Sequence, residues 1–191
     1  IEVDLDGDGN SDQVRVVTIT DSKYITAETS YNGNLVWKEF GEWGSYSASE
    51  VEVTPEFGTD VNQDGANELW LKINPLTGPA GGAKEHYVYV FQDCELQVTN
   101  NTEAEPFNFY RGNTVSGEAF YIDCVLEDGV ARLVYHEDYR IGEPGDFVWA
   151  YVPTALRLTG TTFEEVISSS FEDDISPAPD PLPTDNCPKT S

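Results

Sequence analysis

Two short segments of the chain, residues 4–12 and 60–68, share a pattern that few structures use. The first reads Asp-Leu-Asp-Gly-Asp-Gly-Asn-Ser-Asp and the second reads Asp-Val-Asn-Gln-Asp-Gly-Ala-Asn-Glu. Oxygen-bearing side chains at the first, third, fifth and ninth positions can converge on one hard cation, and glycine at the sixth position permits a sharp turn. Two copies in one chain argue against chance. The sequence therefore predicts two calcium loops.

The predicted ligands come from alternate positions of each loop. The first loop offers the carboxylates of Asp4, Asp6, Asp8 and Asp12 and the carbonyl of Asn10, and the second offers the side chains of Asp60, Asn62, Asp64 and Glu68. Each ion is expected to hold a turn of a small acidic β-module together. Asp-Gly and Asn-Gly runs also form ordinary hairpin turns, which is the alternative for a single copy.

The loops begin like those of EF-hands but continue differently. An EF-hand needs a bidentate glutamate at its twelfth position and flanking helices. Counted from the first aspartate of each loop, the twelfth positions hold Arg15 and Leu71. The residues after the loops, 13–20 and 69–73, have the composition of strands. Each loop is therefore expected to open a β-strand.

In these loops the chain resembles the FG-GAP/VCBS repeat family, whose loops of the form DxDxDGxx(D/E) lie in β-repeats like those of integrin-type propellers. In that family the side chains at the first, third, fifth and ninth positions and the carbonyl at the seventh position bind calcium. The resemblance implies two Ca²⁺ ions. It also adds the carbonyl of Ala66 to the ligands of the second loop.

The chain is strongly acidic, with 10 Lys and Arg residues, 35 Asp and Glu residues and a formal net charge of -25 at pH 7. This charge makes nucleic acids and anionic membrane surfaces poor partners. No apolar run approaches the ~20 residues of a transmembrane helix. The acidity suits a secreted protein in a calcium-containing or salty medium, or a protein that meets a basic partner. Because the sequence begins at Ile1 and contains no Met, Ile1 is expected to follow a removed segment.

Three cysteines, Cys94, Cys124 and Cys187, show no CxxC spacing. With only two histidines beside them, a zinc site is not expected. Oxidised pairing in an extracellular compartment is the better interpretation. The predicted disulfide joins Cys94 to Cys124, and the competing pairing joins Cys187 to one of these two.

The hydrophobic pattern predicts an all-β chain. Strands are expected at 14–20, 24–31, 35–40, 50–53, 68–73, 87–91, 95–99, 119–124, 130–135, 147–152 and 155–158. Residues 162–168 fit a helix face or a strand, and the repeat order favours a strand opposite 156–158.

Asp-Gly pairs mark a repeated unit. They begin at Asp8, Asp64 and Asp128, which are 56 and 64 residues apart. The third copy lacks the other ligands and is expected to be a plain hairpin turn. Three units are too few to close a usual propeller. The expected fold is therefore an antiparallel β-repeat, a propeller-fragment or sandwich-like body of about three stacked units.

Three connectors between the strands are candidates for ligand contact. Segment 40–46 has aromatic side chains that can stack on a sugar ring, although packing onto the core is the simpler interpretation. Segments 74–84 and 140–146 occupy matching places in their units, so their cationic residues are expected at the rim of any site there, with solvated loops as the alternative. The residues concerned are Trp43, Tyr46, Lys84 and Arg140.

The final segment, 172–191, differs from the rest because it contains five prolines among polar residues. This composition predicts an extended tail after a calcium-binding β-repeat domain at 1–171. Such a segment buries little apolar surface by itself, so we expect it to dock on another protein.

No nucleophile elbow, phosphate loop, dinucleotide fingerprint or metal-hydrolase motif appears, so catalytic activity is not expected. The expected function is a secreted or cell-surface module for adhesion, recognition or an extracellular assembly, with a protein partner or a second copy of itself. The alternative is a carbohydrate-active protein on a β scaffold, either glycan-binding or a glycoside hydrolase.

Overall fold

The computed structural model describes residues 1–20, 22–29, 35–40, 50–75, 84–113, 119–127, 130–141 and 148–166, and none of these is helical. Thirteen strands are present in this part of the chain. They are β1 (Glu2–Val3), β2 (Asp12–Ile19), β3 (Ser22–Glu28), β4 (Leu35–Phe40), β5 (Val51–Thr59), β6 (Glu68–Pro75), β7 (Lys84–Gln92), β8 (Glu95–Val98), β9 (Asn108–Asn113), β10 (Ala119–Glu127), β11 (Val130–Ile141), β12 (Val148–Thr159) and β13 (Thr162–Glu165). The prediction of an all-β chain is confirmed.

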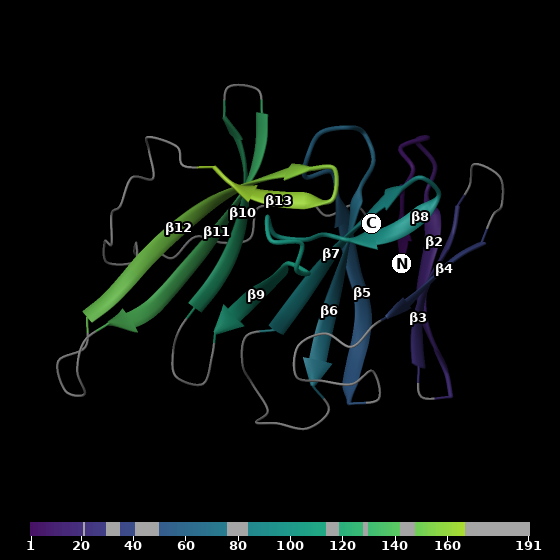
Figure 1. Cartoon of the computed structure of the whole chain (residues 1–191), viewed down its shortest axis with the longest axis horizontal. Coiled ribbons are helices and arrows are strands. Elements are labelled where there is room, and N and C mark those ends of the chain that lie inside the picture. Colours follow the sequence, from purple (N-terminus) through teal and green to yellow (C-terminus); the bar gives the residue numbers. More distant parts are fainter. Residues whose placement is uncertain are drawn as a thin grey trace.

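The strands form antiparallel sheets that succeed one another along the sequence (Figure 1). The first sheet has the order β1-β2-β3-β4. The remaining strands follow the order β13-β12-β11-β10-β9-β7-β6-β5, with β8 paired to β7. Because β9 pairs with both β7 and β10, it joins a group made of β5–β8 to a group made of β10–β13. The described strands thus make three consecutive units in an open, sandwich-like body.

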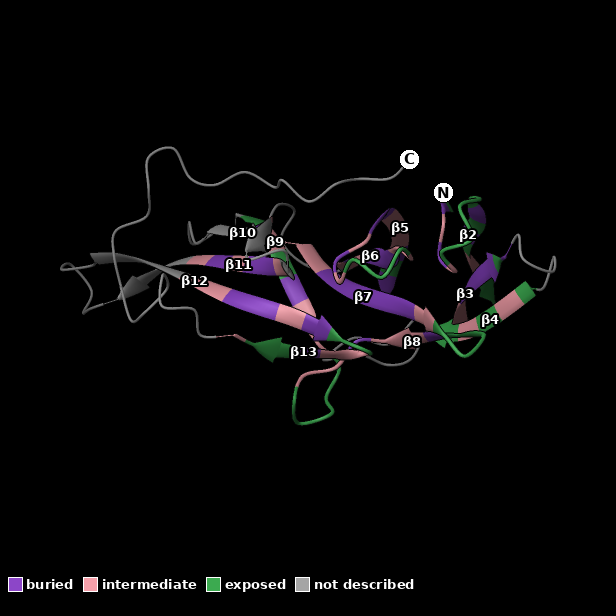
Figure 2. Cartoon of the chain, turned by 90° about the horizontal axis from the view of Figure 1, so that it is seen from above, coloured by how far each residue is buried: buried purple, intermediate pink, exposed green. Residues whose placement is uncertain are grey.

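Two hydrophobic clusters lie on opposite sides of the middle unit. The first cluster packs the sheet of β1–β4 against β5–β8, and the second packs β5–β7 and β9 against β10–β13. Alternation along β6 explains this arrangement: Leu69 and Leu71 enter the first cluster, and Trp70 between them enters the second. Buried residues also fill the centre of β7 (Figure 2). The middle unit is therefore apolar on both faces.

Several predicted hairpins are confirmed. Strands β3 and β4 are antiparallel neighbours whose pairing begins with Glu28 and Leu35, next to the Asn-Gly segment. Strands β10 and β11 are antiparallel neighbours whose pairing begins with Glu127 and Val130, next to the Asp-Gly segment. The turn residues themselves lie outside the described part. The ambiguous segment after residue 161 forms β13, in which Phe163 pairs with Leu158 of β12.

Several strands differ from the prediction: β1 was not expected, and β5 ends at Thr59 rather than at residue 53. Strand β9 was not expected, because Asn and Gly are unfavourable in strands. The two strands predicted at 147–152 and 155–158 are one continuous strand, β12, which contains Pro153. Pro153 pairs with His136 of β11, whereas β13 pairs with β12 only from Leu156 onward. A residue without an N–H is tolerated where the strand has one neighbour.

Candidate functional site: two aspartate loops

Both predicted loops connect the first two strands of their units. The segment 4–12 runs from β1 into β2, and the segment 60–68 runs from β5 into β6. The prediction that each loop opens a strand is confirmed, because β2 begins at Asp12 and β6 begins at Glu68. The two loops therefore occupy equivalent places in successive units.

The aspartate at the first position organises each loop through backbone amides. The carboxylate of Asp4 accepts hydrogen bonds from Gly7 N at 2.9 Å and from Gly9 N at 2.9 Å. The carboxylate of Asp60 accepts a hydrogen bond from Gly65 N at 3.1 Å, the equivalent of the bond from Gly9. Asp60 also accepts a hydrogen bond from the fifth-position amide, Asp64 N, at 3.2 Å, where Asp4 accepts from the fourth-position amide. Both loops therefore curl around the first carboxylate and have one of these bonds in common.

The backbone conformations of the loops also match. At the sixth position Gly9 has φ 85° and Gly65 has φ 96°, which is the left-handed region that glycine enters without steric cost. At the fourth position Gly7 has φ 72° and Gln63 has φ 62°. The second loop thus keeps the same turn even where its residue is not glycine.

The third and fifth positions repeat this equivalence. Asp6 accepts a hydrogen bond from Asp8 N at 3.2 Å, and Asn62 accepts one from Asp64 N at 2.9 Å. The fifth-position carboxylates accept from the seventh-position amides, Asp8 from Asn10 N at 2.8 Å and Asp64 from Ala66 N at 2.9 Å.

The ninth-position carboxylates are buried beneath the loops. Asp12 is 0% exposed and accepts a hydrogen bond from Leu5 N at 2.8 Å. Glu68 is 1% exposed and accepts a hydrogen bond from Val61 N at 2.7 Å. Each closing carboxylate therefore fixes the second residue of its own loop, and the longer Glu68 side chain takes the role of Asp12.

Negative charge accumulates in both loops. Burial raises the pKa of Asp6 above its ordinary value, and the neighbouring charges of Asp12, Asp8 and Asp4 act in the same direction. Burial raises the pKa of Glu68 to about 8, with further contributions from the second-loop aspartates. Carboxylates held this close favour a bound cation, which would offset their mutual repulsion.

The residues of the first loop fit a calcium ion by chemistry and placement. Carboxylate oxygens of Asp4, Asp6 and Asp8 lie within 4.8 Å of one another. The Oδ2 atom of Asp6 is buried without a hydrogen-bond partner. All the predicted donors are oxygen atoms, which are the ligands that Ca²⁺ takes. In the second loop the Asn62 amide stands at the third position, so that loop carries one charge fewer there.

The predicted disulfide between Cys94 and Cys124 is wrong. Cys94 is a free, exposed cysteine in the turn between β7 and β8, where it has φ 62°. Cys124 is disulfide-bonded, so its partner is not Cys94. The prediction placed both residues at strand ends, whereas Cys94 lies in a turn and Cys124 lies within β10. A place along a strand says nothing about distance across the sheets. Cys187 lies outside the described residues.

The predicted ligand-contact residues are not brought together in the described structure. Trp43 and Tyr46 lie outside it, as does the Pro-rich tail from residue 172. Lys84 and Arg140 were expected in connectors but belong to strands β7 and β11. That placement is a correction: the strands extend further than their hydrophobic segments. A carbohydrate site remains a prediction from the sequence.

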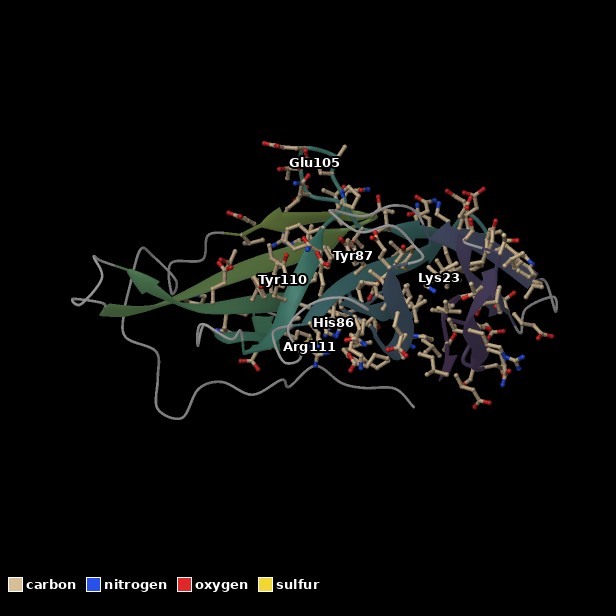
Figure 3. The ribbon with its side chains drawn as sticks, turned by 90° about the horizontal axis from the view of Figure 1, so that it is seen from below. Lys23, His86, Tyr87, Glu105, Tyr110 and Arg111 are labelled. Atoms are coloured by element: carbon tan, nitrogen blue, oxygen red, sulfur yellow. The ribbon has the colours of Figure 1, made fainter. Side chains whose placement is uncertain are left out.

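A charged cluster that the sequence reading missed lies across β5, β6, β7 and β9. Glu56 accepts hydrogen bonds from Lys72 Nζ at 3.3 Å and Arg111 Nη1 at 3.0 Å, and it lies 2.8 Å from His86 Nε2. His86 and Arg111 lie side by side on neighbouring strands (Figure 3). The guanidinium of Arg111 also lies 5.0 Å from the centroid of the Phe57 ring. Since β9 was not predicted, no sequence signal placed Arg111 beside Glu56.

No family model, curated protein or solved structure matches this chain. Within the described residues, no helix has the length and apolar character needed to span a membrane.

Proposed function

We propose that this chain is a calcium-stabilised β-repeat module in which each aspartate loop binds one Ca²⁺ ion. The observation that carries the proposal is the equivalence of the two loops. They share four equivalent hydrogen bonds, the same left-handed positions and a buried closing carboxylate, although they differ at six of nine residues. The resemblance of both loops to the FG-GAP/VCBS pattern supports the same conclusion.

In the first loop the ion would be held by the side chains of Asp4, Asp6, Asp8 and Asp12 with the carbonyl of Asn10, and in the second by those of Asp60, Asn62, Asp64 and Glu68 with the carbonyl of Ala66. Each ion would tie the first strand of a unit to the second strand. Because the loops connect β1 to β2 and β5 to β6, the role proposed for calcium is to fix the first and middle units.

The net charge of -25 fits a module that works outside the cell in a medium rich in divalent cations, where it presents a rigid β surface to a protein partner. Adhesion, recognition and membership of an extracellular assembly are the roles proposed for it. No chemistry of its own is assigned to the module.

Thermal unfolding with CaCl2 and with EGTA tests the proposal. A ligand that binds only the folded state at about a hundred times its Kd stabilises by about 2.7 kcal/mol per site, so EGTA should lower the Tm. Asp8→Ala and Asp64→Ala should each remove part of the calcium effect. Glu103→Ala removes one exposed carboxylate from a different loop and should leave the calcium effect intact. A wild-type Tm that does not respond to EGTA would refute calcium stabilisation.

A further inference from the structure

The two aspartate loops are joined to each other by hydrogen bonds. The backbone N–H of Asn67 donates to the carbonyl oxygen of Asp4 at 2.9 Å. The side-chain Nδ2 of the same residue donates to the same carbonyl oxygen, also at 2.9 Å. One residue of the second loop thus holds the first residue of the first loop from two directions, across 63 positions of sequence.

Close backbone contact accompanies these bonds. A Cβ atom added to Gly7 would lie 3.3 Å from Ala66 N and 3.3 Å from the carbonyl carbon of Gly65. Below the loops, a Cβ atom added to Gly58 of β5 would lie 2.2 Å from Val3 Cγ1 of β1. The first hairpin is therefore seated directly on the second, with the loop backbones close together at Gly7.

The position of Asn67 within its own loop gives this contact a consequence. Asn67 lies between Ala66, whose carbonyl is a proposed ligand, and Glu68, the closing carboxylate. Its partner Asp4 supplies the first carboxylate of the other loop. The backbone segment that an ion would order in one loop is thus bonded to the segment that an ion would order in the other.

We propose that the two calcium sites load as a coupled pair and that Asn67 is the positioning residue that couples them. The inference rests on the proposed function. An ion in either loop fixes the shared Asn67–Asp4 contact, so the second ion meets a loop that is already ordered. The coupling is reciprocal, since each ion must raise the affinity for the other by the same factor.

A four-protein cycle measures the coupling by calorimetric titration with CaCl2. Wild type and Asn67→Ala are each compared with the same protein carrying Asp64→Ala, which disables the second loop. In the wild-type background, Asp64→Ala should weaken binding at the first loop by at least about fivefold, the lower end of ordinary coupling. In the Asn67→Ala background, Asp64→Ala should weaken calcium binding at the first loop by less than about twofold. Ser11→Ala alters the equivalent, exposed position of the first loop and should leave the coupling unchanged.

Two results would overturn the inference while leaving calcium binding in place. In one, the two ions bind wild type independently. In the other, Asp64→Ala has the same effect on binding at the first loop with and without the Asn67 side chain. Absence of any calcium binding to wild type would overturn the proposed function and the inference with it. If Asn67→Ala fails to fold in EGTA, Asn67→Leu gives the same comparison, because it keeps about the size of the side chain, removes the donor and adds no charge.

Discussion

Replacing Glu56 by glutamine tests how far the charged cluster on the middle unit stabilises the fold. Three cationic or ionisable groups surround this carboxylate, from Lys72, His86 and Arg111. The hydrogen bond with His86 is the main cause that lowers the pKa of Glu56 from 4.5 to about 2, and the charges of the three neighbours add to it, against an opposing effect of burial. Glu56→Gln keeps the shape and removes the charge.

The size of the effect follows from this pKa. A difference of about 2.5 pH units corresponds to about 3.4 kcal/mol at 1.36 kcal/mol per unit. Because the Glu56 side chain is 31% exposed, solvent screening reduces the expected contribution to about 2 kcal/mol. The pKa is lower in the folded state, so this stability is present above pH 4.5 and is lost as the pH falls towards about 2.

Urea unfolding at a series of pH values between about 5 and 2 measures the effect, since this range brackets the two pKa values and urea, unlike guanidinium chloride, does not screen charges. The free energy of unfolding of wild type minus that of Glu56→Gln should shrink by about 2 kcal/mol across it. Titration of the other acidic groups is common to both proteins and cancels in this difference. Glu52→Gln, an exposed substitution on the same strand, is the matched control. A difference for Glu56→Gln that changes no more than that of the control would show that the cluster contributes no net charge stabilisation.

Two further predictions concern packing and covalent structure. Gly58→Ala should lower the free energy of unfolding in urea by about 1–3 kcal/mol, because the added Cβ would overlap Val3. This loss should be smaller in a Val3→Ala background. An equal loss in both backgrounds would contradict the packing of β1 on β5. In the native protein Cys94 should react with a thiol reagent, and non-reducing peptide mapping should link Cys124 to Cys187, the remaining cysteine of the sequence. A cross-linked peptide that contains Cys94 would refute this assignment.

Local signals in the sequence were sufficient for the loops and for most strands. Alternating aspartates with glycine at the sixth position fix the loop conformation through short-range hydrogen bonds, such as that from Gly9 N to Asp4, so the local sequence contains the necessary information. The strand at Phe163 could also be predicted, because its alternation of apolar and polar residues matches that of the strand before it.

Contacts between distant segments could not be predicted from the sequence. The bonds from Asn67 to Asp4 depend on how two units stack, which no local pattern encodes. The strand around Arg111 has weak intrinsic preference and forms because β7 and β10 offer it edges on both sides. The environment of Glu56 could not be inferred for the same reason: three of its neighbours come from three other strands.

The unequal burial of the sheets has a consequence for how the molecule opens. Strand β6 lies between β5 and β7 and contributes to both hydrophobic clusters, so exposing it requires nearly complete unfolding. Strand β4 lies at a sheet edge, pairs only with β3 among the described strands, and leaves Leu35 and Trp37 about half exposed. Such an edge can separate in a local, low-energy fluctuation. The first aspartate loop joins β1 to β2 at the opposite edge of the same sheet, so β4 can separate while this loop and the middle unit stay folded.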